Sequence, residues 1–352
     1  MTADAPLLLP LLAEVGARAL LVADENCVDF PFAQLTGAAV LSNRRDIADA
    51  ARHAGCKVLF SDFDFAPWST GELDLIAAPL AKEKAVVHHI ANSAAALLSP
   101  GGRLVLTGGK QEGIKTFAKT LSARLGGEAS LEKHGTRYRL TLYRGPQPGE
   151  PLDDRNYQIL RPVLELDGLP VLSKPGLFGW DRIDAGSALL ASHLPALLAA
   201  QTLDDKGTTD TSASPHTLVD LGCGYGYLSL LAARCGNFHI TATDNCAAAL
   251  LACESNFRAH GINGETVAAD AGHTLSGPFD ILLCNPPFHQ GFQNDSRLTD
   301  KFLAAARRLL HSRGCALFVV NSFVPLENLA AGIFSRVRVI ENDRRFKVIA
   351  LG

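Results

Sequence analysis

Short apolar segments alternate with amphipathic or alanine-rich segments along most of the chain, a pattern typical of strands alternating with helices. In the first half, strands are predicted at 17–23, 38–41, 57–60, 73–77, 103–106 and 138–143, and helices at 46–53, 84–98 and 113–125. Residues 99–102 (SPGG) act as a helix stop and a turn. Such alternation predicts an α/β fold with a doubly wound, mostly parallel sheet.

The second half repeats this organisation. Strands are predicted at 217–221, 239–244, 266–269, 279–284, 314–320, 337–340 and 346–351, and helices from 228 and at 247–260 and 299–311. No helix separates the last two strands, so we expect a terminal antiparallel pair. A further helix is expected near 190, with Pro195 close to its end. The second half therefore predicts another doubly wound, mostly parallel sheet.

Residues 145–154 are rich in proline, glycine and acid, and they predict a link between two domains. A chain of 352 residues is also long for a single domain. We therefore expect one domain at 1–150 and a second at 151–352.

Two pairs of segments indicate an internal duplication. Residues 73–79 resemble 279–286, and residues 101–106 resemble 313–318. The first copy has VADEN at 22–26 where the second copy has glycines, and it has no Asn-Pro-Pro. We expect two similar folds, of which only the second keeps a working site.

Composition narrows the functional class. The net charge of −3 argues against a generally basic coat for nucleic acid, although residues 110–144 hold eight Lys and Arg against three Glu. Such a local excess of positive charge is expected either to bind along the phosphates of an RNA or merely to form a solvated helix face. None of the eight cysteines forms a C-x-x-C pair, so we expect no metal site and a reducing cytoplasm. The apolar segment 7–12 lacks a preceding basic region, and no run has membrane-spanning length, so no signal peptide and no membrane partner are expected.

A glycine turn after the strand at 217–221 predicts a cofactor site. Gly222, Gly224 and Gly226 let the backbone approach a ligand, but Tyr227 stands where a nicotinamide fingerprint needs its third glycine. The carboxylate of Asp220 disfavours a pyrophosphate and suits the ammonium and sulfonium groups of S-adenosyl-L-methionine.

Two more carboxylates follow the next strands. Asp244 is expected to accept both ribose hydroxyls, and Asp270 to meet the adenine amino group. The alternative is that Asp220, Asp244 and Asp270 merely cap or bound their strands.

Asn285-Pro286-Pro287-Phe288, which ends the strand at 279–284, predicts a site for a planar amino group. The Asn285 side-chain oxygen and the Pro286 carbonyl would accept the two N–H groups of an exocyclic amine. The prolines fix φ and remove competing donors, and Phe288 offers a stacking face worth roughly 1–3 kcal/mol. A proline-rich turn without function is the alternative for this motif.

Three neighbouring residues have weaker claims. His289 beside Phe288 is a proton acceptor or, like most single histidines, structural. Cys223 and Cys284 flank the site without a base partner in sequence, so we expect neither to be a nucleophile.

At these residues the chain resembles the class I S-adenosylmethionine methyltransferases, and specifically the tandem-domain, RsmC-type guanine-N2 methyltransferases of ribosomal RNA. Residues 175–178 (PGLF) and 184–190 (DAGSALL) resemble the family's lead-in to its catalytic domain, which implies that Phe178 and Asp184 lie near the site. The resemblance implies two tandem Rossmann-like folds, a degenerate first copy that binds or supports RNA, and a catalytic second copy.

The resemblance also implies a substrate and a mechanism. It implies 16S rRNA, within the small (30S) subunit or a late precursor, as partner, and S-adenosyl-L-homocysteine as product. We expect a monomer. Asn285, Pro286 and Phe288 would be catalytic, Pro287, Phe288 and His289 would bind substrate, and Asp220, Gly222, Gly224, Gly226, Asp244, Asp270 and Asn285 would bind cofactor. Open alternatives are guanine of 23S rRNA, a protein glutamine, a DNA adenine, or a non-catalytic RNA-binding assembly factor.

Overall fold

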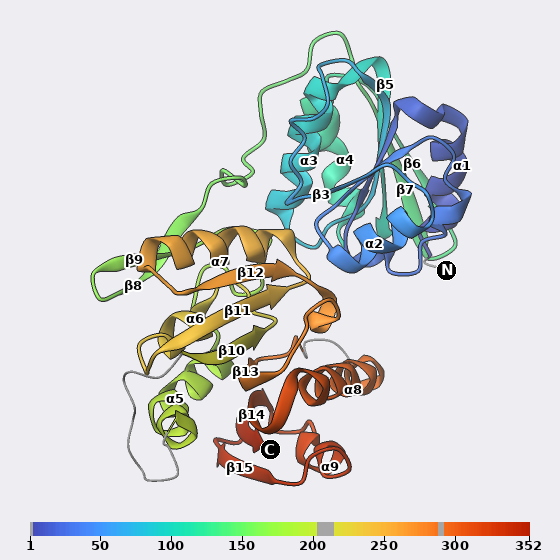
Figure 1. Ribbon diagram of the computed structural model, residues 1–352. Helices are drawn as coiled ribbons and strands as arrows, with labels where there is room; N and C mark the ends of the chain where they lie inside the picture. Colours follow the sequence, from blue (N-terminus) through green and yellow to red (C-terminus); the bar gives the residue numbers. More distant parts are fainter. Residues whose placement is uncertain (1–2, 203–214, 288–291) are drawn as a thin grey trace. The chain divides into compact units, whose positions relative to one another are not determined.

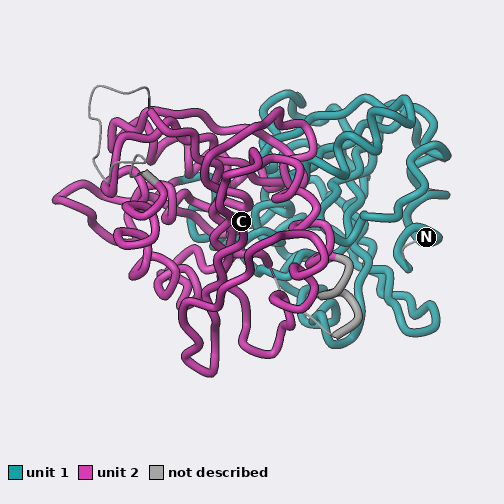
Figure 2. Tube along the Cα trace, turned by 60° about the horizontal axis from the view of Figure 1, so that its bottom comes forward, with its two compact units in different colours: residues 1–159 teal, residues 160–352 magenta. Residues whose placement is uncertain are grey.

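The computed structural model describes residues 3–202, 215–287 and 292–352 (Figure 1). The chain divides into two compact units, Met1–Ile159 and Leu160–Gly352 (Figure 2). Each unit contains a seven-stranded sheet, and a two-stranded sheet formed by β8 and β9 belongs to the second unit.

The first sheet has the order β3-β2-β1-β4-β5-β7-β6. Its strands are β1 (Ala19–Ala23), β2 (Ala39–Ser42), β3 (Val58–Phe60), β4 (Leu73–Pro79), β5 (Leu98–Gly109), β6 (Ala129–His134) and β7 (Arg137–Tyr143). The helices of this unit are α1 (Ala5–Val15), α2 (Arg45–His53), α3 (Lys84–Leu97) and α4 (Ile114–Leu125), with short 3₁₀ turns η1 (Gly16–Arg18), η2 (Glu25–Cys27) and η3 (Phe32–Gln34).

The second sheet repeats that order as β12-β11-β10-β13-β14-β16-β15. Its strands are β10 (His216–Leu221), β11 (Phe238–Asp244), β12 (Gly264–Ala268), β13 (Phe279–Cys284), β14 (Leu310–Asn321), β15 (Val337–Asn342) and β16 (Phe346–Leu351). The remaining elements are β8 (Arg161–Leu166), β9 (Leu169–Ser173), α5 (Ala185–Thr202), α6 (Tyr227–Ala232), α7 (Ala247–His260), η4 (Asp270–Gly272), α8 (Phe292–Leu309) and α9 (Leu326–Ala330).

The strand directions confirm the predicted fold class. The first five strands of each sheet are parallel. The next strand, β7 or β16, is antiparallel to them, and the edge strand, β6 or β15, pairs antiparallel with it and so runs in the direction of the first five. The chain is thus two tandem Rossmann-like folds, each with a terminal antiparallel pair.

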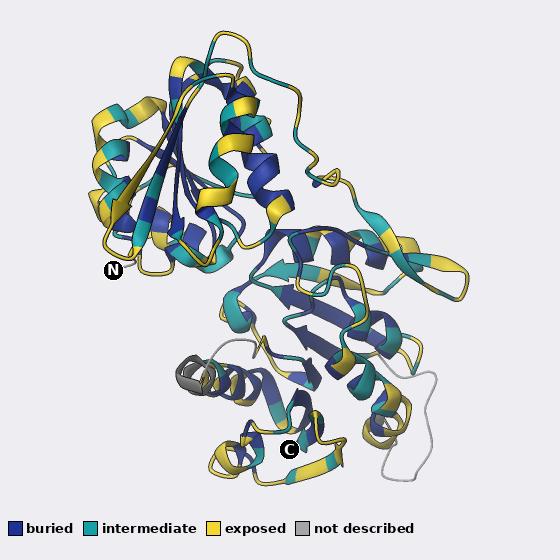
Figure 3. Ribbon diagram, turned by 180° about the vertical axis from the view of Figure 1, so that it is seen from behind, coloured by how far each residue is buried: buried dark blue, intermediate teal, exposed yellow. Residues whose placement is uncertain are grey.

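Helices cover both faces of each sheet because successive strand residues point to opposite sides. In β1, Leu20 and Val22 pack with α3 and α4, whereas Leu21 packs with α1 and α2. The same division occurs in the second unit, where Val219 packs with α8 and Leu218 with α5 and α7. The central strands are accordingly buried on both sides (Figure 3).

Several elements depart from the sequence expectations. Helix α1, strand β6, the β8–β9 hairpin and α9 were not predicted. The turn at 99–102 interrupts β5 without ending it, because pairing with β4 jumps from Leu98 to Arg103. Pro195 lies inside α5 and not near its end.

The segment 151–159 packs with the first unit, whereas the expected second domain began at 151. Asn92 on α3 donates to the Leu152 carbonyl and accepts from the Leu152 N–H. The Tyr157 hydroxyl donates to Asp62 at 2.7 Å. These bonds attach Leu152 and Tyr157 to the first unit, which ends at Ile159.

The registers make the two sheets equivalent position by position. Leu75 of β4 pairs with Ala19 of β1, and Ile281 of β13 pairs with Leu218 of β10. Counting outward from these pairs, Asp74 corresponds to Asp280. The structure therefore bears out the duplication that the sequence indicated.

Asp74 and Asp280 bond to residues at equivalent positions, at the amino ends of their strands. Asp74 accepts from Arg18, just before β1, and from Ser99, just after α3. Asp280 accepts from the Thr217 N–H and hydroxyl and lies 2.9 Å from His311. These bonds lower the pKa of Asp74 to about 2 and lower the pKa of Asp280 from its ordinary value. We call these two sets of bonds the latches.

Replacing Asp280 with Ala should lower the free energy of unfolding by about 1–3 kcal/mol, because the carboxylate's hydrogen bonds are lost together. Since the folded-state pKa is depressed, this stabilisation is present at neutral pH and is lost as pH falls below about 4. Thermal unfolding of the full chain measures the effect. Asp300→Ala, which removes an exposed carboxylate on α8, is the matched control and should change little.

Candidate functional site

The predicted cofactor residues lie at the carboxyl ends of four neighbouring strands. Spatial order along the edge is β12, β11, β10 and β13. Leu221 pairs with both Thr243 and Cys284, so the glycine turn, Asp244 and Asn285 follow at one level. This edge is where open α/β sheets bind ligands.

The glycine turn has the open backbone that its composition predicts. Gly222, Gly224 and Gly226 have φ values of +81°, +54° and +87°. A Cβ on Gly224 would meet nothing within 4 Å, so this backbone faces space that a ligand can enter. A Cβ on Gly226 would lie 2.8 Å from Cys253 Sγ, so this glycine is required by packing.

Asp244 closes the turn from the adjacent strand. Its Oδ2 accepts from the Gly224 N–H at 3.0 Å, and its Oδ1 accepts from the Cys246 N–H at 2.8 Å. A carboxylate has about four acceptor positions, so each oxygen retains capacity for a hydroxyl donor.

Asp220 lies beneath the turn with 1% of its surface exposed. Its Oδ2 accepts from the Ser229 hydroxyl at 2.6 Å and from the Ser229 N–H at 3.2 Å. Burial raises the pKa of Asp220 to about 6, against the opposing effect of the Ser229 bonds. A cation in the turn would favour the ionised form.

Asp270 lies in η4, just beyond β12. The intervening Ala269 N–H donates to the Asp244 carbonyl at 3.0 Å, which joins this position to the turn. The Asp270 carboxylate binds the Lys301 ammonium of α8. Lys301 was not recognised in the sequence, because nothing local connects residues 31 positions apart.

Asn285 is held by the start of α5. Its Nδ2 donates to Asp184 Oδ2 and to Ser187 Oγ, both at 2.8 Å. Because a carboxylate only accepts, the Asn285 atom that faces Asp184 must be the nitrogen. Both N–H groups are thus engaged, and Oδ1 is left as an acceptor.

Asp184 also begins α5. Its Oδ2 accepts from the Ser187 N–H at 2.9 Å, which is the bond that an N-cap residue makes. The structure thus places Asp184 at the site, as the resemblance implied, but against Asn285. Ser187 is a site residue that the sequence analysis did not single out.

The rest of the acceptor motif is only partly described. Pro286 is buried and Pro287 is exposed. Phe288 and His289 lie outside the described residues. Phe178 is 59% exposed.

The cysteines at this edge are unsuited to covalent chemistry. The neighbouring Cys253 and burial raise the pKa of Cys223 well above its usual range, and burial does the same for Cys284. Protonated thiols are poor nucleophiles. Among the described residues, no group of His, Cys, Asp and Glu has the arrangement of a metal site.

Lys174, next to β9, is a buried charge that no pattern in the sequence singled out. It is fully buried, and burial lowers the pKa of its ammonium to about 7. Cys246, the residue whose N–H binds Asp244, opposes that shift.

The first unit lacks the predicted site residues at the equivalent positions. From the strand registers, Leu21 stands in place of Asp220, Ser42 in place of Asp244, and Pro79 in place of Asn285. Ser42 still accepts from the N–H two residues on, as Asp244 does. The turn after β2 therefore has the same side-chain bond as the turn after β11, with a hydroxyl in place of the carboxylate.

The basic segment at 110–144 is less available than its composition suggested. Arg137 binds Asp4 and Glu112, Arg139 binds Glu132, and Arg124 binds Asn92 and the Gly149 carbonyl. The exposed basic residues of this segment are all lysines: Lys110, Lys115, Lys119 and Lys133.

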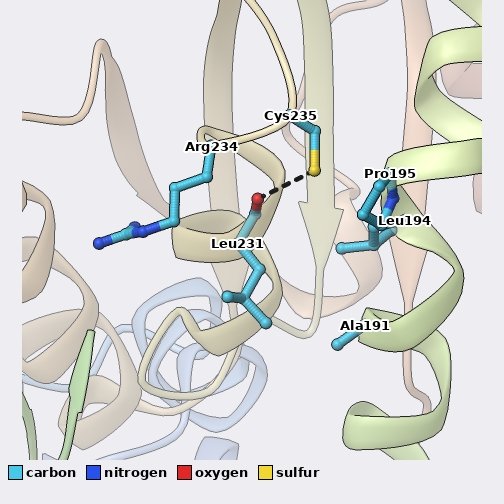
Figure 4. Close-up of a pocket in the computed structure, with 6 residues that line it drawn as sticks. All are labelled: Ala191, Leu194, Pro195, Leu231, Arg234 and Cys235. Atoms are coloured by element: carbon cyan, nitrogen blue, oxygen red, sulfur yellow. Dashed lines mark hydrogen bonds between the residues drawn. The ribbon is translucent and has the colours of Figure 1, made fainter. Parts of the chain in front are cut away.

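A cavity of about 430 Å³ lies between α5 and α6 (Figure 4). It is lined by Ala191, Leu194, Pro195, Leu231, Arg234 and Cys235, and the Cys235 thiol donates to the Leu231 carbonyl at 3.3 Å. Helix α6 starts at the glycine turn and runs away from it, so this cavity at its far end is separate from the site.

Comparison with known proteins identifies relatives among the ribosomal RNA methyltransferases. Residues 168–350 match the family model of the methyltransferase small domain. Ribosomal RNA small subunit methyltransferase C of Aeromonas hydrophila is 30% identical over 81% of this chain and 79% of the relative. The Escherichia coli protein of that name (strain SMS-3-5) is 31% identical over 72% of this chain and 67% of the relative.

A solved structure shares the whole fold. The T. thermophilus 16S rRNA N2 G1207 methyltransferase (RsmC), in complex with AdoMet and guanosine, matches 99% of this chain and 91% of its own. The TM-score is 0.81 at 22% sequence identity. The family model and the curated relatives show that the chain belongs to the ribosomal RNA small subunit methyltransferase C family, with its methyltransferase small domain in the second unit.

Proposed function

We propose that this protein transfers a methyl group from S-adenosyl-L-methionine to the exocyclic N2 of a guanine in 16S rRNA. One observation carries the proposal: the Asn285 amide has both N–H groups bound by Asp184 and Ser187, which leaves Oδ1 to accept from an amine beside the glycine turn. The names of the curated relatives support the ribosomal RNA of the small subunit as the substrate, and the T. thermophilus neighbour is a 16S rRNA N2 G1207 methyltransferase.

The residues of the turn fit the cofactor. The backbone of Gly222, Gly224 and Gly226 gives the close approach, and an ionised Asp220 would face the cationic end. Asp244 would hold the ribose hydroxyls, and Asp270 would bind the adenine amino group. When bound, the cofactor supplies an electrophilic methyl group.

The protein's own contribution is positioning. Asn285 Oδ1 and the Pro286 carbonyl would accept the two N2–H groups, which draws the nitrogen toward tetrahedral geometry and aims its lone pair. Pro287, Phe288 and His289 remain the predicted contacts of the guanine base. The guanine would be splayed out of its RNA to reach this edge.

The cellular context follows from the same proposal. The substrate would be 16S rRNA within the 30S subunit or a late precursor, modified in the cytoplasm by a monomer. The first unit would support binding of the RNA rather than chemistry. Among the described residues, no helix is both long and apolar enough to cross a membrane.

Transfer of labelled methyl from S-adenosyl-L-methionine tests the function directly. Small subunits from cells lacking this protein should be labelled, and nucleoside digestion should place the label in N2-methylguanosine. Label in 23S rRNA, protein or DNA under the same conditions would refute the proposed acceptor.

Asn285→Ala should reduce kcat by at least about 100-fold, because the preorganised acceptor of the amine is lost. The affinity for S-adenosyl-L-methionine, measured by calorimetry, should stay nearly unchanged. Asn285→Asp should also destabilise the fold, since it places a second carboxylate against Asp184. An Asn285→Ala enzyme with full activity would rule out this role for the amide.

Asp184→Ala should lower kcat more than Ser187→Ala, because Asp184 both orients Asn285 and caps α5. The loss of the cap should also lower the free energy of unfolding by about 1 kcal/mol. Ser187→Ala removes one hydroxyl acceptor and leaves the carboxylate in place. Steady-state kinetics and thermal unfolding of both variants measure the two effects. Equal kinetics for the two variants would contradict the orienting role.

Asp220→Asn tests the cationic end of the cofactor. A raised folded-state pKa means that the stability contributed by Asp220 is present below about pH 4 and is lost as pH rises through about 6. The free energy of unfolding of the variant, relative to that of the wild type, should therefore increase by up to about 3 kcal/mol from pH 4 to pH 7.

Cofactor affinity should show the opposite trend. If the carboxylate faces a cation, the wild type binds S-adenosyl-L-methionine more tightly as pH rises through about 6, and Asp220→Asn does not. Calorimetric titrations at pH 5 and pH 7 measure this. Identical pH profiles for both proteins would place the cation elsewhere.

A further inference from the structure

The turn between β15 and β16 lies at the same edge of the sheet as Asn285. Strand β16 is antiparallel to both β14 and β15, so β15 ends where β13 and β14 end. Asn321, the last residue of β14, pairs with Phe346, the first residue of β16. Topology thus brings the turn, residues 343–345, to the carboxyl edge that carries the site.

Packing joins this turn to the acceptor residues. A Cβ on Gly186 would lie 3.2 Å from two carbons of the Phe346 ring and 3.1 Å from Asp184 Oδ2. That oxygen is the one that binds Asn285. The Phe346 ring, at the end of the turn, therefore lies against the first turn of α5 beside the acceptor.

The turn presents two arginines to solvent. Arg344 and Arg345 are exposed, and neither guanidinium lies within ion-pairing distance of a carboxylate in the described part of the chain. The Arg345 guanidinium lies 5.7 Å from the centre of the Phe346 ring. The nearby Asp343 accepts from the N–H groups of Arg345 and Phe346 at 2.8 and 2.6 Å. The backbone thus holds its Oδ1, and its charge attracts Arg345 without forming an ion pair. Both guanidinium groups remain exposed to solvent.

Arg344 occupies a position that folding alone does not favour. Its φ of +73° is in the left-handed region, where glycine or asparagine is usual in a tight turn. A long charged side chain at such a position costs stability and indicates a use for that side chain.

An exposed aromatic residue adjoins the arginines. Phe323 is 62% exposed, and the preceding Ser322 N–H donates to the Arg345 carbonyl at 2.9 Å. The Ser322 hydroxyl also donates to Asn342 at 2.9 Å, so the Phe323 loop is fixed against the turn. An aromatic face and two guanidinium groups thus share one edge with Asn285.

We propose that Phe323, Arg344 and Arg345 form an RNA-binding rim that holds the nucleotides flanking the target guanine. This rests on the proposed function. Guanidinium groups bind phosphates through two parallel hydrogen bonds, and their charge matches the RNA backbone. A splayed guanine leaves its neighbour without a stacking partner, and Phe323 supplies one.

The arginines are tested by Arg344→Ala/Arg345→Ala in the full-length protein, with 16S rRNA and small subunits from cells lacking this protein as substrates. We expect the apparent KM for RNA to rise about tenfold and kcat to change less than about twofold. The slope of log affinity against log salt should fall by about two, one for each phosphate that the variant no longer binds. Affinity for S-adenosyl-L-methionine should be unchanged.

The matched control is Arg313→Ala/Arg338→Ala. These two arginines are also exposed, but they lie at the starts of β14 and β15, at the opposite edge of the sheet. The control removes the same charge and should leave the KM for RNA and the salt slope near the wild-type values. Equal effects of the two double variants would overturn the rim.

Phe323→Ala tests the stacking contact. It should raise the KM for RNA about tenfold, Phe323→Trp should retain the wild-type KM, and Phe323→Leu should behave like alanine, because leucine keeps bulk without a flat face. Restoration by leucine would overturn stacking. If the unaltered protein methylates no RNA guanine, the proposed function fails. If the unaltered protein is active and the Arg344→Ala/Arg345→Ala variant has the same KM for RNA, the rim alone is refuted.

Discussion

The hydrogen bond from Asn285 to Asp184 is the interaction on which the site depends. It joins the end of β13 to the start of α5, two segments 101 residues apart in the chain. The carboxylate decides which end of the amide points outward, because it can bind only the nitrogen. A hydrogen-bond acceptor fixed in this way costs no reorganisation when an amine arrives. The same Asp184 oxygen also caps α5, so the orientation of the Asn285 amide and the start of the helix form one arrangement.

The two units show which parts of this fold serve stability and which serve chemistry. The latches at Asp74 and Asp280 occupy equivalent positions and make equivalent bonds at the amino ends of their strands. At the carboxyl ends, the first unit has Leu21, Ser42 and Pro79 at the positions that carry the predicted site residues of the second unit. The first sheet has the same strand order without these residues, and its apolar core and the latch at Asp74 lie at other positions.

The sequence predicted the parts of the structure that local patterns determine. The alternation of apolar segments indicated both parallel sheets, and the glycine turn and the Asn-Pro-Pro motif marked strand ends that lie together at one edge of the second sheet. It missed α1 and β6; in β6, residues exposed along the whole strand show no apolar alternation. It also missed Ser187, Ser229 and Lys301, since each acts on a residue nine or more positions away. The burial of Asp220 follows from packing beneath the turn, which no short motif records.

The contact between Gly226 and Cys253 limits how this family's sequences change. A methyl group at 226 would overlap the sulfur at 2.8 Å, and Cys253 is itself fully buried on α7. The φ of +87° at Gly226 also disfavours any residue with a Cβ, so a smaller residue at 253 would relieve the overlap but not the backbone strain. Backbone conformation and side-chain packing thus impose the same restriction, so a glycine at 226 is built into the shape of the loop.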